Sequence, residues 1–224
     1  MSFQDLLDAL RQRGAISFIV GRHPFQRLIS GYRDKIVGAL AGSLHHKLNR
    51  NILINYRGLS PKELVRMQSI KKVDRLQRRR RYMSSRNARP LPPVRRLVPT
   101  FKEFVSFILD EVEQGRDLDM HWTPVYSFCN PCQVNFTHLV KFETFDTDSN
   151  TIVEAAGLQS YLPRSNGKLS HENPSKSLQG AERTMENYLK ELSKEQVGNL
   201  TRLYQPDFDI FGYKVPPYEL PAGL

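Results

Sequence analysis

A chain of 224 residues is long enough to form one globular domain with a sizeable hydrophobic core. It has no apolar run of about 18 residues and no signal peptide, so we expect no part of it to span a membrane or direct secretion. The formal net charge is +10, and residues 71–96 alone hold 11 Lys or Arg against one acid, Asp74. The basic character therefore belongs to one segment and is not a general property of the surface.

The N-terminal elements are a short helix and then a strand, a turn and a second helix. Residues 3–11 have apolar residues on one helical face. A short apolar run (Ile16, Phe18, Ile19, Val20) predicts a buried strand that ends at Gly21. Pro24 suits the first turn of the next helix, which we predict to reach Leu40. Arg22 then follows a strand and precedes a helix, where open α/β sheets bind ligands and anions are favoured.

Residues 41–98 are predicted to be a basic, flexible insertion, with a helix after Ser60-Pro-Lys-Glu63. Three interpretations of residues 71–96 compete: a solvated loop, a patch for a polyanionic glycan, and a nucleic-acid-binding or nuclear-localisation segment. Nucleic acid is the least supported partner, because Tyr82 is the only aromatic residue within residues 71–96 and the chain has no nucleic-acid-binding motif.

The second half of the chain alternates helices and strands. A capping box at Thr100–Glu103 opens one helix, and residues 139–143 alternate like a strand. Residues 148–156 predict a helix that ends at Gly157, and a second capping box lies at residues 193–196. This alternation favours an α/β fold with a central parallel sheet flanked by helices, in a single domain over residues 1–224.

Five motifs occur in chain order. Residues 22–35 read R-x-P-F-x-R-L-x-S-x-Y-R-x-K, and the others are Thr100-Phe-Lys-Glu-Phe-Val105, Asp119-Met-His-Trp122 through Cys132, Val140-Lys-Phe-Glu-Thr144 and Tyr204-Gln-Pro-Asp-Phe208 through Tyr213. Together they resemble Golgi carbohydrate sulfotransferases of the HNK-1 and chondroitin 4-O-sulfotransferase family. The matches leave residues 41–98 and 158–180 uncovered.

The resemblance implies that the chain binds 3′-phosphoadenosine 5′-phosphosulfate (PAPS) as sulfate donor, with no metal. In the family, the Arg and Ser of the first motif hold the donor's 3′-phosphate, and here these are Arg22 and Ser30. Pro24, Arg27 and Arg33 complete this donor-binding motif. The chemistry agrees, because a guanidinium can grip phosphate with two charge-assisted hydrogen bonds and a hydroxyl adds another donor.

The implied activity is O-sulfation of a chondroitin- or dermatan-like glycan, or of a glycoprotein glycan, on the lumenal side of the Golgi membrane. The family fold is P-loop-like, with a 5′-phosphosulfate-binding loop on its first strand and an N-terminal membrane anchor. Neither is recognisable here, so we expect an N-terminally truncated domain without its first strand, which binds part of the donor and transfers no sulfate by itself. The alternative is a non-catalytic basic module that binds anionic glycan or nucleic acid through residues 71–96.

His121 is the candidate general base, because a histidine can titrate near neutral pH. The competing interpretation is a structural histidine packed by Trp122. The family has an acid at the position of Met120, where it could orient the histidine. Lys141 and Glu143 alternate along a predicted strand, so they could reach the site or form a plain ion pair.

Cys129 and Cys132 form a C-x-x-C pair, which alone is compatible with a zinc half-site, a redox motif or a disulfide. A Golgi lumenal location, implied by the resemblance, makes the disulfide the expectation. Asn135 and Asn199 lie in glycosylation sequons, as a lumenal glycoprotein would have. Asn135 is close to a predicted strand, so Asn199 is the preferred glycan site.

Overall fold

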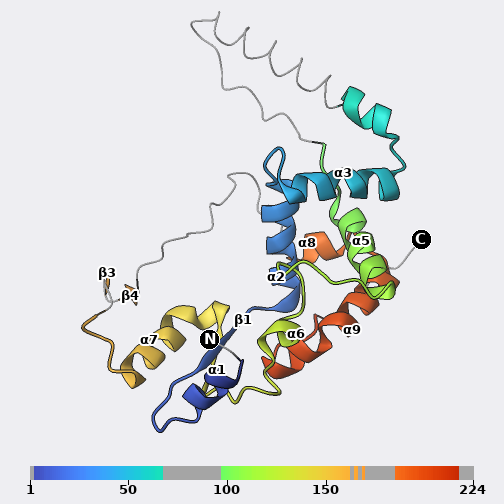
Figure 1. The fold of residues 1–224 in the computed structure, drawn as a ribbon. Helices are drawn as coiled ribbons and strands as arrows, with labels where there is room; N and C mark the ends of the chain where they lie inside the picture. Colours follow the sequence, from blue (N-terminus) through green and yellow to red (C-terminus); the bar gives the residue numbers. More distant parts are fainter. Residues whose placement is uncertain (1–2, 68–96, 162–163, 166–167, 170–184, 217–224) are drawn as a thin grey trace, which may run out of the picture. The chain divides into compact units, whose positions relative to one another are not determined.

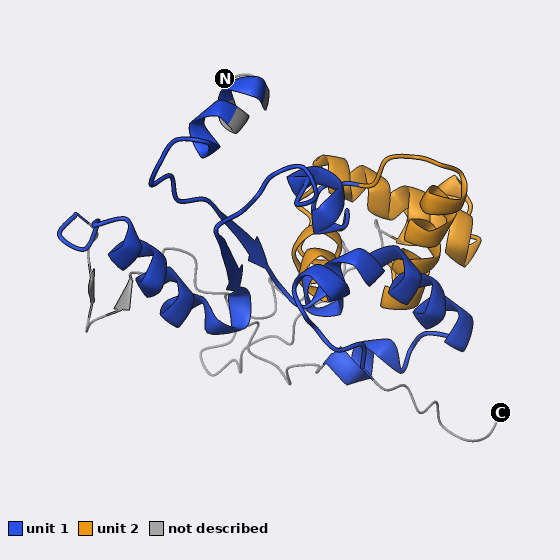
Figure 2. Cartoon of the chain, turned by 90° about the horizontal axis from the view of Figure 1, so that it is seen from below, with its two compact units in different colours: residues 1–28, 119–224 blue, residues 29–118 orange. Residues whose placement is uncertain are grey.

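The computed structural model describes residues 3–67, 97–161, 164–165, 168–169 and 185–216 (Figure 1). The chain divides into two compact units, the first made of residues 1–28 with 119–224 and the second of residues 29–118 (Figure 2). Helix α2 (Pro24–Gly31) begins in the first unit and ends in the second. Among the described helices, none has the length and apolar composition needed to cross a membrane.

The first unit is a mixed α/β structure around a small parallel sheet. Strands β1 (Phe18–Gly21) and β2 (His138–Lys141) pair in parallel, with Phe18 opposite His138 and Gly21 opposite Lys141. The other elements are α1 (Phe3–Leu10), α6 (Val125–Cys129), the 3₁₀ helix η2 (Phe142–Thr144), α7 (Phe145–Ala155), the antiparallel pair β3 (Arg164–Ser165) and β4 (Lys168–Leu169), α8 (Met185–Leu189) and α9 (Lys194–Ile210). The parallel pairing and the flanking helices agree with the predicted α/β class.

Strand β1 is buried on one face only, which corrects the prediction of a strand covered on both sides. Ile19 is 4 % exposed and packs with Val125 and Phe211, whereas Phe18 and Val20 are 50 % and 39 % exposed. Successive side chains of a strand point to opposite faces, so one face of β1 packs on the core and the other is open.

The end of β1 requires a glycine. A Cβ atom on Gly21 would lie 2.2 Å from Cδ1 of Phe211, a distance at which one of the two must move. The absent side chain lets the Phe211 ring, which is 2 % exposed, close over the strand end. This contact fixes the chain direction just before Arg22.

In the second unit, α2 continues into a π-helix, η1 (Tyr32–Val37), which ends at Gly38 and not at Leu40 as predicted. The Tyr32 ring packs 5.3 Å and 5.5 Å, between centroids, from Phe101 and Phe104, and its hydroxyl donates to the Pro99 carbonyl at 2.8 Å. Phe101 opens α5 (Phe101–Glu113), whose capping box is confirmed.

The helix α3 (Leu44–Arg57), which we did not predict, lies inside the proposed insertion. Ser43 caps its first turn, and Ile52 and Leu53 are fully or almost fully buried. Residues 61–67 are helical, which confirms the helix predicted after Ser60. The segment 44–57 is therefore ordered core structure, and the basic residues of 71–96 lie outside the described residues.

Candidate functional site

The carboxyl edge of the parallel sheet brings Arg22 close to the segment that follows β2. The Arg22 guanidinium lies 4.6 Å from the centroid of the Phe142 ring. Helix α2 begins two residues later at Pro24, so the predicted placement of Arg22 between a strand end and a helix N-terminus is confirmed. Arg22 is half-buried, and a guanidinium at this position suits an anionic ligand.

Glu143 is an acidic component of the same edge. Its carboxylate accepts hydrogen bonds from the Tyr213 hydroxyl at 2.5 Å and the His23 backbone N–H at 3.2 Å. Burial by itself raises the pKa of Glu143, but these hydrogen bonds and the charge of Arg22 bring it below its usual range. Glu143 is therefore an ionised group that satisfies one N–H before α2 and partly balances Arg22.

The interpretation of Lys141 and Glu143 as neighbours on one face of a strand is wrong. Strand β2 ends at Lys141, and Glu143 lies in the 3₁₀ helix η2. The Lys141 ammonium instead lies 5.0 Å from the centroid of the Tyr213 ring, and its backbone N–H donates to Asp148 at 2.9 Å. Tyr213 thus receives contacts from both residues.

Arg27 is committed to the backbone of the turn that carries His121. Its guanidinium donates to the carbonyls of Met120 at 2.7 Å and Thr123 at 2.5 Å, and lies 5.5 Å from the Phe128 ring centroid. These contacts make Arg27 a residue that positions this turn. The donor-binding role that the motif implied for Arg27 stays a prediction.

Asp119, and not a residue at position 120, orients His121. The Nδ1 atom of His121 lies 2.5 Å from Oδ1 of Asp119, which also accepts the His121 backbone N–H at 2.9 Å. The His121 and Asp119 side chains are each 34 % exposed, whereas Met120 is 70 % exposed. An aspartate that holds Nδ1 leaves Nε2 to accept a proton, as a general base requires.

Two residues of α9 fix the backbone that follows His121. The Tyr204 hydroxyl donates to the Trp122 carbonyl at 2.5 Å, and the Asp207 carboxylate accepts the N–H groups of Val125 and Tyr126 at 2.8 and 2.9 Å. Asp207 therefore caps α6, which lies against α9 (Figure 1). Burial raises the pKa of Asp207 against the lowering effect of these two bonds. The motif contained both residues, but the sequence assigned no role to either.

Comparison with known proteins identifies the family. The model of the family described as "Sulfotransferase family" matches residues 3–214. The chain belongs to the sulfotransferase family. Carbohydrate sulfotransferase 11 of Mus musculus is 27 % identical over 209 residues, which are 93 % of this chain and 49 % of that protein. Carbohydrate sulfotransferase 8 of Mus musculus is 27 % identical over 199 residues, covering 87 % of this chain and 39 % of that protein. Carbohydrate sulfotransferase 14 of Danio rerio is 24 % identical over 206 residues, covering 92 % and 46 %.

The chain spans about half the length of the curated relatives it matches. No solved structure matches it. The resemblance to carbohydrate sulfotransferases inferred from the motifs is confirmed by these relatives.

The remaining residues of the donor motif in this sulfotransferase chain lie along one continuous helical segment. Pro24 is the first residue of α2 and is buried, Ser30 lies in the last turn of α2, and Arg33 lies in η1. Ser30 and Arg33 belong to the second unit, whereas Arg22 and Pro24 belong to the first.

The cysteines and the sequons lie in the first unit. Cys129 and Cys132 are unbonded in the structure, and burial raises the pKa of the Cys129 thiol; the disulfide that the resemblance implies stays a prediction. Asn199 lies inside α9, is half-buried and accepts a hydrogen bond from Arg202. Asn135 is exposed in the loop before β2. The sequon of Asn199 therefore lies inside a helix and that of Asn135 in an exposed loop, and the glycan sites stay predictions.

Proposed function

We propose that this chain is the part of a PAPS-dependent carbohydrate sulfotransferase that binds the 3′-phosphate end of the donor and provides the general base. The observation that carries the proposal is Arg22, half-buried at the carboxyl edge of the parallel sheet, just before the N-terminus of α2. This placement favours an anion through both the guanidinium charge and the helix dipole. From the resemblance alone, we also propose Ser30 and Arg33, which belong to the second unit, as donor-binding residues.

Glu143 limits what this edge can bind. It already takes the His23 N–H, and it lies where its charge offsets that of Arg22. The site therefore favours a multiply charged phosphate, which keeps a net attraction, over a singly charged carboxylate. His23, whose pKa is lowered mainly by burial, adds no cationic charge near neutral pH.

The proposed reaction transfers a sulfuryl group in line to a sugar hydroxyl. The Nε2 atom of His121 takes the hydroxyl proton, the sugar oxygen forms a bond to sulfur, and the bond from sulfur to the donor's phosphate oxygen breaks. Asp119 holds Nδ1 and so keeps His121 in the tautomer that accepts this proton. Arg27, Tyr204 and Asp207 keep the turn in place.

The acceptor we propose is a chondroitin- or dermatan-like chain, and the proposed location is the lumenal side of the Golgi membrane. Both rest on the resemblance and on relatives named carbohydrate sulfotransferases. Among the described strands, β1 pairs only with β2, so its other edge is available to the larger, P-loop-like sheet that we propose for the whole protein. We propose that a further strand there carries the 5′-phosphosulfate-binding loop.

Calorimetric titration with 3′-phosphoadenosine 5′-phosphate tests the donor site. We expect saturable binding by this chain and by Arg202→Ala, which removes an exposed guanidinium from α9. Arg22→Ala is expected to weaken binding at least tenfold, as roughly 1.5–3 kcal/mol is lost with a charged hydrogen bond. His121→Ala is expected to keep this binding but to abolish transfer in the full-length enzyme. Equal binding by Arg22→Ala and Arg202→Ala contradicts the proposed site.

A further inference from the structure

The end of α9 places Tyr213 beside the turn between β1 and α2 (residues 21–24), which carries Arg22. Gly212 has a backbone φ of +59°, its N–H donates to the Asp209 carbonyl at 3.2 Å, and the Tyr213 N–H donates to the Phe208 carbonyl at 2.9 Å. These are the features of a Schellman C-cap. Local geometry therefore directs the chain off the helix, and the Tyr213 ring packs 5.5 Å, between centroids, from that of His23.

The Tyr213 hydroxyl determines the direction of the Glu143 carboxylate. It donates to Oε2 of Glu143 at 2.5 Å, whereas Oε1 accepts the His23 backbone N–H at 3.2 Å. The Gly21 carbonyl lies farther from the hydroxyl, at 3.4 Å, so the single hydroxyl proton is directed at Glu143. Burial and this bond raise the pKa of Tyr213, so the hydroxyl stays a donor near neutral pH. Each carboxylate oxygen thus has a donor other than Arg22.

Arg22 is the competing partner of this carboxylate. Its guanidinium lies 4.6 Å from the ring centroid of Phe142, the residue before Glu143. Burial raises the pKa of Glu143, the largest effect that lowers it is the bond from Tyr213, and the charge of Arg22 lowers it less. Glu143 is exposed, so its side chain has room to turn toward Arg22 when the tyrosine bond is lost. A guanidinium and a carboxylate would then form a two-bond ion pair, which a phosphate must displace before it binds.

We propose that Tyr213 is a positioning residue of the donor site, because its hydroxyl holds the Glu143 carboxylate at the His23 N–H and prevents an ion pair between Glu143 and Arg22. The guanidinium can then bind the 3′-phosphate. The inference rests on the proposed binding of the donor at Arg22. It explains how an acidic residue lies beside a phosphate-binding arginine without closing the site, and it gives the segment after α9 a function.

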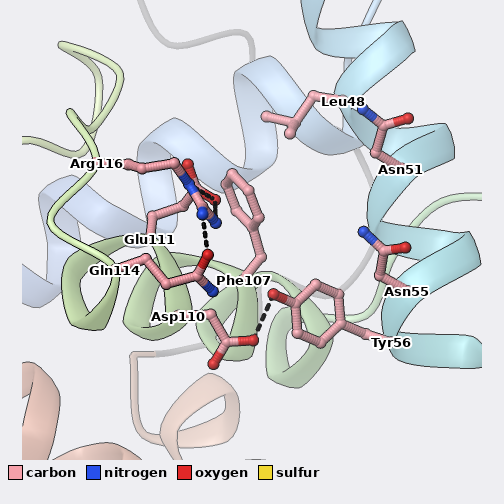
Figure 3. Close-up of a pocket in the computed structure, with 9 residues that line it drawn as sticks. All are labelled: Leu48, Asn51, Asn55, Tyr56, Phe107, Asp110, Glu111, Gln114 and Arg116. Atoms are coloured by element: carbon pink, nitrogen blue, oxygen red, sulfur yellow. Dashed lines mark hydrogen bonds and ion pairs between the residues drawn. The ribbon is translucent and has the colours of Figure 1, made fainter.

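Calorimetric titration with 3′-phosphoadenosine 5′-phosphate tests the positioning role. Tyr213→Phe removes the hydroxyl and keeps the ring against His23, so the variant is expected to fold. We expect its dissociation constant to rise roughly three- to tenfold, as loss of one hydrogen bond does. Tyr56→Phe is the matched control, since the Tyr56 hydroxyl also donates to a carboxylate, that of Asp110 at 2.6 Å, in the pocket between α3 and α5 of the second unit (Figure 3). This control is expected to bind like the wild type.

Glu143→Gln separates positioning from a structural role of the tyrosine. The amide oxygen still accepts the His23 N–H, but an amide forms no ion pair with Arg22. We expect Glu143→Gln to bind at least as tightly as the wild type, because the charge that offsets Arg22 is gone. In this background, Tyr213→Phe is expected to change the dissociation constant by less than about twofold, since the group that it releases carries no charge. A hydroxyl that served only folding would weaken binding in both backgrounds.

Equal binding by Tyr213→Phe and Tyr56→Phe, or losses of similar size with and without Glu143→Gln, overturns the inference. Arg22→Ala distinguishes this failure from that of the donor site. If Arg22→Ala still weakens binding, only the positioning role of Tyr213 is refuted. Binding by Arg22→Ala that equals that of the wild type, or no binding by the wild type, overturns the donor site together with the inference.

Discussion

Asp207 is the residue whose loss we expect to destabilise the His121 region most directly. It is 2 % exposed, and its carboxylate accepts the N–H groups of Val125 and Tyr126 at the start of α6. In Asp207→Ala both N–H groups lose their acceptor. The Val125 N–H is buried and has no route to water, whereas Tyr126 is 38 % exposed. The cost should therefore come mainly from Val125.

The expected loss follows from these two environments. A buried donor without a partner costs about 1–3 kcal/mol, and an exposed one costs less because water replaces the acceptor. The burial that raises the pKa of Asp207 also means that the carboxylate is poorly solvated, so removing it gives part of this energy back. We expect the free energy of unfolding to fall by about 2 kcal/mol for Asp207→Ala. Asp207→Asn keeps one acceptor oxygen and is expected to lose about half as much.

Urea unfolding followed by far-UV circular dichroism measures these differences. Asp209→Ala is the matched control, since Asp209 is an exposed aspartate of the same helix whose carboxylate accepts from the nearby Gln205 side chain at 2.8 Å. It is expected to stay within about 0.5 kcal/mol of the wild type. If Asp207→Ala is no less stable than Asp209→Ala, the capping of α6 by Asp207 contributes nothing and the reasoning fails.

The pH dependence gives a second check on the same residue. Because folding raises the pKa of Asp207, the folded state holds this proton more tightly than the unfolded chain. The stability that depends on protonated Asp207 is full below about pH 3.9, the unfolded value, and is lost as the pH rises through the folded pKa. The difference between wild type and Asp207→Asn should thus be smaller at pH 7 than at pH 4.

Two further predictions concern packing and charge. Gly21→Ala places a Cβ atom 2.2 Å from the Phe211 ring and is expected to lower the free energy of unfolding by about 1–3 kcal/mol. Gly198→Ala adds a methyl group in open space inside α9 and is expected to raise it by about 0.5–1 kcal/mol. Urea unfolding should show changes of opposite sign for the two variants, and changes of the same sign contradict the reasoning. Burial raises the pKa of Glu103, but the bonds from Arg57 and Thr100 lower this pKa overall. The ion pair therefore stabilises the fold fully above about pH 4.3, the unfolded value, and this stabilisation is lost as the pH falls through the folded pKa. The stability gap between wild type and Glu103→Gln should shrink below that pH, and a gap that stays constant argues against this reasoning.

The elements that could be predicted from the sequence are those whose signals are local. Both capping boxes lie within four residues, Thr100 with Glu103 and Ser193 with Gln196, and both helices begin where these residues indicated. The glycine stop at residue 157 is also local, with a backbone φ of +66°. Residues three positions apart at a helix start are close enough to form the capping hydrogen bonds whatever the rest of the fold, so the sequence alone predicts them.

The elements that could not be predicted depend on partners far along the chain. Helix α6 is only five residues long and is capped by Asp207, 82 residues from Val125. Helix α3 is rich in polar residues, and its buried Asn49 donates to the Ile36 carbonyl at 2.7 Å, a tertiary contact that no periodicity reveals. The exposure of Phe18 likewise depends on which distant elements pack on that face of β1.

The motif of the first strand and helix shows what a sequence pattern leaves undecided. Arg22 and Arg27 are chemically equivalent and five residues apart, and the pattern gave both to the donor. The structure separates them, since Arg27 donates to two backbone carbonyls, whereas Arg22 lies at the sheet edge beside Phe142. A guanidinium that satisfies carbonyl oxygens cannot use the same N–H groups for phosphate.

The acid of the proposed base was misplaced for a related reason. The family pattern has its acid at position 120, where this chain has Met120. A carboxylate two residues before a histidine can bond both its ring and its backbone N–H when the chain turns, as Asp119 does. The chemistry of the pair is thus retained by a shift of one residue. Loss of an acid from one motif position is therefore weak evidence of an inactive site unless its neighbours are also examined.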